Sequence, residues 1–243
     1  MKPAITVRNL SKTFRIPGER RGTLRERLMK MHLRNEVKAR KTLDAINFDV
    51  MEGEFFGIIG RNGSGKSTLL KILSGIYQPD AGSQITINGH IAPMLELGVG
   101  FNPELTGREN VFLSATILGL SRQQILECYG KIVEFAELAD FMELQVKHYS
   151  SGMSVRLAFA VAMQVQAPIL LLDEVLAVGD FAFAEKCFAH FEECRRQRRT
   201  IILVTHNAAS MERFADRAML IHKSKLHAIG NPHEVLEKYQ ALG

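Results

Sequence analysis

The stretch Gly60-Arg61-Asn62-Gly63-Ser64-Gly65-Lys66-Ser67 decides how this chain is interpreted, because it forms a complete G-x-x-x-x-G-K-S pattern. Its glycines let the backbone bend so that successive N–H groups point at phosphate oxygens. Lys66 can reach the β- and γ-phosphates of a nucleotide, and the Ser67 hydroxyl can ligate Mg²⁺. We expect an apolar strand at 54–59 and, behind the loop, a helix that starts with Ser67 and Thr68. The sequence therefore predicts a loop that holds the phosphates of a nucleotide.

Composition limits the class of protein. The chain has 243 residues, of which 46% are hydrophobic and 23% are charged, as in ordinary soluble globular proteins. No apolar run is long enough to span a bilayer and no secretory signal stands at the start, so we expect the chain to stay in the cytoplasm. The three cysteines lack metal-ligand spacing, and their odd number argues against a disulfide framework.

The order of apolar patterns predicts an α/β fold of the P-loop NTPase type with a mixed sheet core. Alternating strands at 5–10, 45–50 and 85–89 indicate an antiparallel β subdomain on the nucleotide core. Continuous apolar runs, typical of a parallel sheet covered on both faces, occupy 169–173, 200–205 and 218–221. Helical patterns fill 107–118, 121–137 and 151–166. We expect one domain, 1–243, with a catalytic lobe at 1–94 and 167–243 and a helical lobe at about 95–166.

Basic charge is concentrated between residues 17 and 41. Residues 20–41 contain nine Lys or Arg and two Glu, a local charge of +7 against +5 for the whole chain. Leu24, Leu28 and Met31 fall at i, i+4 and i+7, an apolar stripe on a basic helix. We interpret 17–41 as a basic insertion that lies at a membrane surface and guides an anionic lipid-linked substrate. A solvated basic face is the alternative.

Two apolar strands end in groups that can act on a terminal phosphate. Asp173 closes the run at 169–173 and can hold Mg²⁺, and Glu174 can orient or deprotonate the attacking water. His206 follows the run at 200–205 and can hydrogen-bond the γ-phosphate. Read alone, these would be solvated acids at a strand end and a surface histidine. Their order after the phosphate loop favours a catalytic set of Glu174, His206 and Lys66.

These features, with Tyr149-Ser150-Ser151-Gly152-Met153 between them, resemble the ATP-binding cassette family over nearly the whole chain. The resemblance implies ATP and Mg²⁺ as cofactors, and a homodimer in which this pentapeptide faces the ATP of the other subunit. The usual pentapeptide is Leu-Ser-Gly-Gly-Gln, so here Ser150 and Gly152 remain, with Ser151 between them. An ordinary Ser-capped helix is the alternative interpretation.

The resemblance also implies roles for three single residues. Phe14 stands where the family places an aromatic ring that stacks on adenine, although a core Phe is the alternative. Asp180 stands in the loop that communicates across the dimer. Glu96 stands where the family has a glutamine that senses Mg²⁺ and the attacking water, so a carboxylate replaces an amide there.

Two strings, at 95–110 and 173–180, resemble a narrower subgroup that exports lipid-linked polysaccharides of the O-antigen, capsule and teichoic acid types. This implies an ATPase peripheral to the cytoplasmic face of the inner membrane, a separate transmembrane permease that handles the polysaccharide, and no nucleic-acid partner. Because the sequence stops at Gly243, we expect no C-terminal carbohydrate-binding domain, unless one was removed. The alternatives are an ATPase of another transporter class or a soluble cassette protein that acts on nucleic acid.

Overall fold

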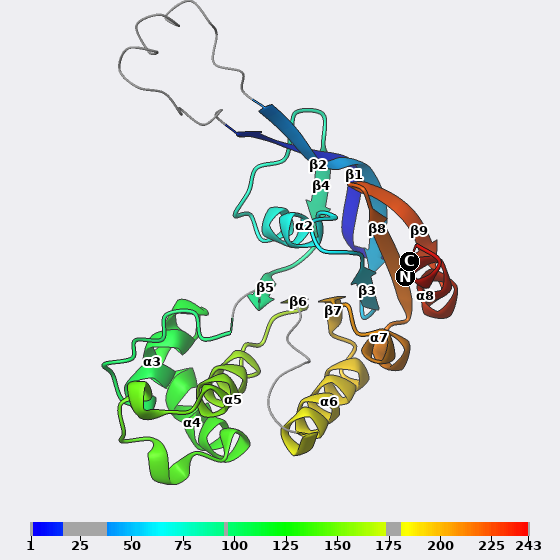
Figure 1. The fold of residues 1–243 in the computed structure, drawn as a ribbon. Coiled ribbons are helices and arrows are strands. Elements are labelled where there is room, and N and C mark those ends of the chain that lie inside the picture. Colours follow the sequence, from blue (N-terminus) through cyan, green and yellow to red (C-terminus); the bar gives the residue numbers. More distant parts are fainter. Residues whose placement is uncertain (1, 17–37, 95–96, 174–180, 243) are drawn as a thin grey trace, which may run out of the picture.

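The computed structural model describes residues 2–16, 38–94, 97–173 and 181–242, and every structural statement below concerns these ranges (Figure 1). Three expectations for single residues therefore lie outside the described part of the chain, namely those for Glu96, Glu174 and Asp180. The interpretation of the basic segment 17–37 lies outside it too.

A six-stranded sheet carries the phosphate loop. Its order is β5-β6-β7-β3-β8-β9, in which only β9 runs antiparallel to its neighbour. The strands are β3 (Phe55–Ile59), β5 (Ile91–Met94), β6 (Ile169–Asp173), β7 (Thr200–Val204), β8 (Arg217–His222) and β9 (Lys225–Gly230). The expected mixed core is confirmed. We did not predict β5, because this edge strand is only four residues long and contains a proline, which is tolerated at sheet edges.

A three-stranded antiparallel sheet lies beside it, in the order β2-β1-β4. It consists of β1 (Pro3–Ile16), β2 (Lys38–Met51) and β4 (Gln84–Ile87). The expected antiparallel part is confirmed, but β1 and β2 are far longer than the sequence suggested. Residues 38–41, which we assigned to the basic insertion, belong to β2 and pair with the end of β1. Basic side chains fit there because β2 is an edge strand, where solvent accepts charge.

One apolar core joins the two sheets to α2 (Lys66–Leu73). Ile5 and Val7 of β1, Leu69 and Leu70 of α2, and Ile202 of β7 are all buried in it. A second core covers the opposite face of the larger sheet, where α6 (Phe181–Arg196) packs. The phosphate loop is therefore held between the buried strand β3 and the helix α2, and α2 packs in the core that both sheets share.

The remaining helices form two groups (Figure 1). The first has its own apolar core and comprises α3 (Gly107–Ile117), α4 (Arg122–Ala136), α5 (Ser151–Ala162) and the short 3₁₀ turns Ala139–Phe141 and Val146–His148. The second packs against β8 and comprises α7 (Ala208–Phe214), which the sequence analysis did not predict, and α8 (Pro232–Gln240). None of the helices in the described ranges has the length and apolar character that a bilayer span requires.

Capping explains the starts of α3 and α4. Thr106 and Glu109 form a reciprocal capping box at α3, and Ser121 with Gln124 forms the same arrangement at α4. In each case two backbone N–H groups that the helix leaves unpaired are satisfied by side chains. The helical patterns predicted starts at 107 and 121, and the structure begins these helices at Gly107 and Arg122.

Candidate nucleotide-binding site

The phosphate loop connects the central strand β3 to α2 through a backbone that needs glycine. Gly65 is the N-cap of α2 with φ 117° and ψ −1°. A Cβ atom at this position would lie 2.6 Å from the carbonyl oxygen of Thr42. Both the positive φ and the close approach of β2 therefore exclude a side chain at residue 65.

Lys66 is buried, with 6% of its surface exposed, and its ammonium group binds backbone oxygens of the loop. Its Nζ donates to the carbonyl oxygens of Gly60, at 2.7 Å, and of Arg61, at 3.3 Å. The amide of Ser64 also donates to the Arg61 carbonyl, at 3.1 Å. These bonds hold the loop in its phosphate-binding shape and place a cation beneath it.

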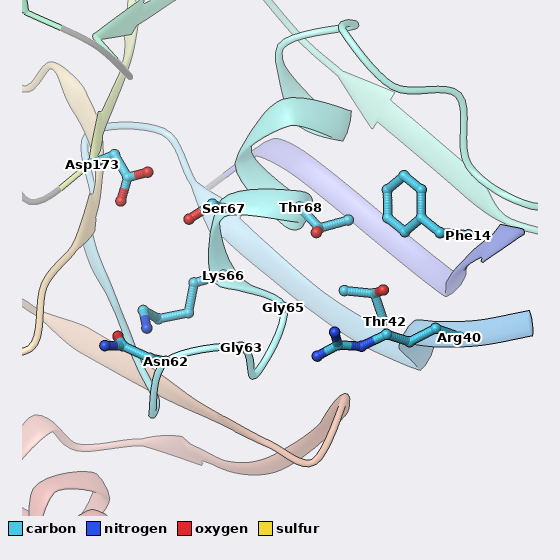
Figure 2. Close-up of a pocket in the computed structure, with 10 residues that line it drawn as sticks. All are labelled: Phe14, Arg40, Thr42, Asn62, Gly63, Gly65, Lys66, Ser67, Thr68 and Asp173. Atoms are coloured by element: carbon cyan, nitrogen blue, oxygen red, sulfur yellow. The ribbon is translucent and has the colours of Figure 1, made fainter. Parts of the chain in front are cut away.

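A cavity of about 780 Å³ opens in front of this loop, within the size range of nucleotide and small-ligand sites. Eight residues that the sequence singled out line it: Phe14, Asn62, Gly63, Gly65, Lys66, Ser67, Thr68 and Asp173. Figure 2 shows a polar end with Asp173, Ser67, Lys66 and Asn62, and an opposite end with Phe14. The cavity thus has the polarity of a nucleotide, with charged groups at one end and an aromatic ring at the other.

Two residues that line the cavity were not predicted from the sequence. Arg40 and Thr42 project from β2 into the same cavity, between the loop and Phe14 (Figure 2). Arg40 appeared in the sequence only as one member of a basic run. Its position became visible only with the register of β1 and β2, in which Phe14 and Arg40 are direct partners.

Phe14 sits at the cavity mouth rather than in the core, and it is only partly buried. Its ring meets Tyr77 edge-on, with centroids 5.4 Å apart, and the Nζ of Lys12 lies 5.3 Å from its centroid. Contacts on the side toward Tyr77 fix the ring, while part of it faces the cavity. This placement fits the expected stacking of a base better than the alternative of a core phenylalanine.

Parallel pairing brings the other predicted groups to the same edge of the sheet as the loop. Asp173 pairs with Val204, which in turn pairs with Ile58. Asp173 ends β6 and lines the cavity, whereas His206 follows the end of β7, is exposed and is not one of the lining residues. The carboxyl edge of a parallel sheet is where open α/β sheets place their ligands.

Three predicted residues lie elsewhere. Ser150 is the N-cap of α5 and its hydroxyl accepts from the amide of Met153, at 3.1 Å. Ser151 and Gly152 form the first turn of that helix. None of the three lines the cavity, and α5 lies with α3 and α4, apart from α2 and the β1–β2 wall (Figure 1). Within one chain, the pentapeptide and the phosphate loop are therefore not brought together.

The donor set near the loop suits Mg²⁺. Ser67 and Asp173 offer a hydroxyl and a carboxylate at the same end of the cavity (Figure 2), and Mg²⁺ binds oxygen ligands while retaining several waters. The described residues contain no group of three or more His, Cys, Asp or Glu that could hold a metal by itself. A metal here would thus depend on the phosphates and water for its remaining ligands.

A positive field surrounds the outer side of the loop. Desolvation lowers the pKa of His222, at the end of β8, and the nearby charges of Lys223, His227 and Arg61 lower this pKa further. The neutral form of His222 is therefore favoured, and Lys223 and Arg61 are the cations beside it.

Comparison with known proteins agrees with this geometry. A model of the ABC transporter family matches residues 43–177, more than half of the chain. The chain is 42% identical to the ABC transporter protein AbcA of Aeromonas salmonicida, covering 99% of this chain and 77% of that protein. It is 45% identical to the O-antigen export system ATP-binding protein RfbB of Klebsiella pneumoniae, covering 84% and 83%. It is 38% identical to the teichoic acids export ATP-binding protein TagH of Shouchella clausii, covering 82% of this chain and 54% of that one.

The fold is also that of solved cassettes. A dimeric structure of the ATP-binding cassette MJ0796 bound to ADP and Pi superposes with a TM-score of 0.73 at 22% identity, covering 94% of this chain and 98% of that one. At this identity the likeness establishes the fold alone. Taken with the family model and the relatives above, which match at 42% and 45% identity over most of their length, it leaves one conclusion. The chain belongs to the ABC transporter family.

Proposed function

We propose that this chain is the ATP-hydrolysing subunit of an exporter for a lipid-linked polysaccharide of the O-antigen or teichoic acid type. The single observation that carries the ATPase assignment is the shape of the cavity lining. Lys66, Ser67 and Asp173 line the end that suits phosphates, and Phe14 lines the end that suits the base. The substrate class is supported by relatives that are named as O-antigen and teichoic acid export proteins.

Catalysis in this site rests on positioning and charge neutralisation, as in other phosphoryl transfers. Lys66 and the loop amides hold the phosphates, and Phe14 stacks on the base. Mg²⁺, when bound through Ser67 and Asp173, neutralises charge on the phosphates. Glu174 orients the attacking water and His206 donates a hydrogen bond to the γ-phosphate.

A second copy completes the site. Ser150 to Gly152 stand at the N-terminus of α5, away from the cavity of their own chain, and a helix N-terminus stabilises an anion. In a two-fold dimer each pentapeptide faces the other copy's triphosphate, and the same surfaces meet on both sides. Closing and opening of this dimer would act on a separate permease at the inner membrane, with this subunit on the cytoplasmic face.

The proposal is tested by measuring ATP hydrolysis and by identifying what copurifies with the chain. We expect the purified chain to hydrolyse ATP with Mg²⁺, and Lys66→Ala to abolish hydrolysis. Affinity purification from detergent extract should recover a membrane protein with the chain. Recovery of nucleic acid instead would favour the soluble alternative and contradict the transport assignment.

The basic segment has its own test. Reversing Arg25, Arg27 and Lys30 to Glu should reduce polysaccharide export strongly while ATP binding stays intact, because attraction to anionic headgroups is worth about 1 kcal/mol per basic residue. Unchanged export would refute a role at the membrane surface.

The matched control reverses three exposed basic residues of the helices, Arg122, Lys131 and Lys238, to Glu. This triple variant changes the net charge by the same amount. Export should stay near the level of the unmodified protein, which separates a local effect of the basic segment from a general effect of charge.

A further inference from the structure

Of the described residues that line the cavity, Arg40 and Lys66 are the two that carry a positive charge. It comes from β2, twenty residues before the phosphate loop begins at Gly60, and no pattern in the sequence connects it with nucleotide binding. Its side chain is exposed, so neither packing nor burial explains its position.

The strand register fixes the face on which Arg40 lies. Phe14 of β1 and Arg40 of β2 are direct partners in the antiparallel pair. Side chains of directly opposed residues project from the same face of a sheet, and residues two apart on one strand share a face. Phe14, Arg40 and Thr42 consequently form one surface, and all three line the cavity.

The guanidinium of Arg40 reaches the phosphate loop itself. A Cβ atom built on Gly63 would lie 3.7 Å from Nη2 of Arg40, and this is the only neighbour within 4 Å of that position among the described residues. Figure 2 shows the side chain directed from β2 back toward the loop. The cation over the ring of Phe14 is Lys12, not Arg40. The guanidinium is therefore placed for phosphates rather than for the base.

Among the residues that the structure describes, Arg40 has no competing anion. Within the described ranges no carboxylate lies in salt-bridge range of it, whereas its neighbour Lys41 pairs with Asp44, and Arg8 on β1 pairs with Asp49. An unpaired guanidinium beside backbone N–H groups is a ready partner for phosphate oxygens, which it can bind with two parallel hydrogen bonds.

We propose that Arg40 binds the phosphate chain of the nucleotide from the side opposite Lys66, and that it makes this cavity favour di- and triphosphates over monophosphates and nucleosides. The proposal rests on the nucleotide site described under the proposed function and adds a specificity-determining residue to it. Phe14 and Arg40 are directly opposite each other in the β1–β2 pair. In this proposal Phe14 binds the base and Arg40 binds the phosphates.

The test compares Arg40→Gln with the unmodified full chain by calorimetric titration of a non-hydrolysable ATP analogue, ADP, AMP and adenosine. We expect the affinity for the ATP analogue and for ADP to fall by about 5- to 30-fold. The loss for AMP should be smaller, and adenosine should change by less than about twofold. The difference should shrink at high salt, because ions screen an exposed charge. Arg40→Lys keeps the charge without the planar fork and should give intermediate affinities.

Arg15→Gln is the matched control. Arg15 is exposed, follows Phe14 directly, pairs with Ala39 and is absent from the cavity, so its removal should leave all four affinities unchanged. Equal affinities for the unmodified chain and Arg40→Gln would overturn the proposal while leaving the nucleotide site intact. An equal loss for adenosine and ATP would also overturn it, because that pattern assigns Arg40 to the base. An unmodified chain that binds no nucleotide would overturn both the proposal and the proposed function.

Discussion

Alanine at Gly60 would force a methyl group into the backbone of β8. The Cβ atom would lie 2.4 Å from the carbonyl oxygen of Ile221 and 2.7 Å from Oγ of Ser64. Since real Cβ contacts essentially never fall below 3.0 Å, the first residue of the loop must move by at least 0.6 Å (3.0 − 2.4). The Ile221 oxygen belongs to the backbone of β8, which pairs with β3 and β9, so we expect the loop to absorb the shift.

Two measurable losses follow from this shift. Overpacking of this kind costs about 1 to 3 kcal/mol of folding free energy. For a chain of this size the melting temperature should fall by about 2 to 12 °C. The carbonyl of Gly60 also holds Nζ of Lys66 at 2.7 Å, so the ammonium group moves with the loop. A misplacement approaching 1 Å can cost about a hundredfold in rate, and we expect ATP hydrolysis to fall by about that factor.

The assay pairs thermal unfolding with steady-state ATP hydrolysis, and Gly130→Ala is the control. Gly130 is exposed inside α4, and a Cβ atom there would meet nothing within 4 Å. This variant should gain about 0.5 to 1 kcal/mol of stability because alanine favours the helix, with unchanged hydrolysis. If Gly60→Ala melted and hydrolysed ATP as the unmodified chain does, the steric reasoning about the loop would be wrong.

Four further outcomes are expected. Glu174→Gln should accumulate ATP-bound dimers in size-exclusion chromatography, and hydrolysis at the unmodified rate would contradict its assigned role. Burial raises the pKa of the Cys187 thiol to about 12, so iodoacetamide at pH 8 should modify the partly exposed Cys128 first, as read by mass spectrometry. Because the folded state keeps the Cys187 proton that the unfolded state loses, its contribution to stability should disappear between about pH 9 and 12 in urea titrations. Glu54→Ala should cost about 2 to 4 kcal/mol in the same titrations, since this buried carboxylate accepts from Arg217 at 3.0 Å.

The parts of the fold that the sequence predicted are those set by local patterns. The runs at 169–173 and 200–204 are buried on both faces, so their continuous apolar character identified them as inner strands. The helices that begin after Thr106 and Ser121 carry capping boxes within four residues. The missed elements lack such patterns. β5 is a four-residue edge strand, and α7 is a seven-residue helix that begins directly behind the turn at His206.

The candidate site also contains residues that local patterns predict and residues that they do not, and this difference has a physical cause. Loop residues such as Lys66 share one short segment, so sequence spacing alone predicts that they act together. Arg40 reaches the loop only because the long hairpin of β1 and β2 sets it opposite Phe14 in the register. That register depends on pairings far along both strands, including Lys12 with Leu43, and on irregularities between them that no spacing rule anticipates. A one-residue slip would turn Arg40 to the other face and out of the cavity. The contribution of Arg40 to nucleotide selectivity is therefore a property of the hairpin as a whole, and changes in the register of β1 and β2 should alter selectivity while leaving the loop sequence untouched.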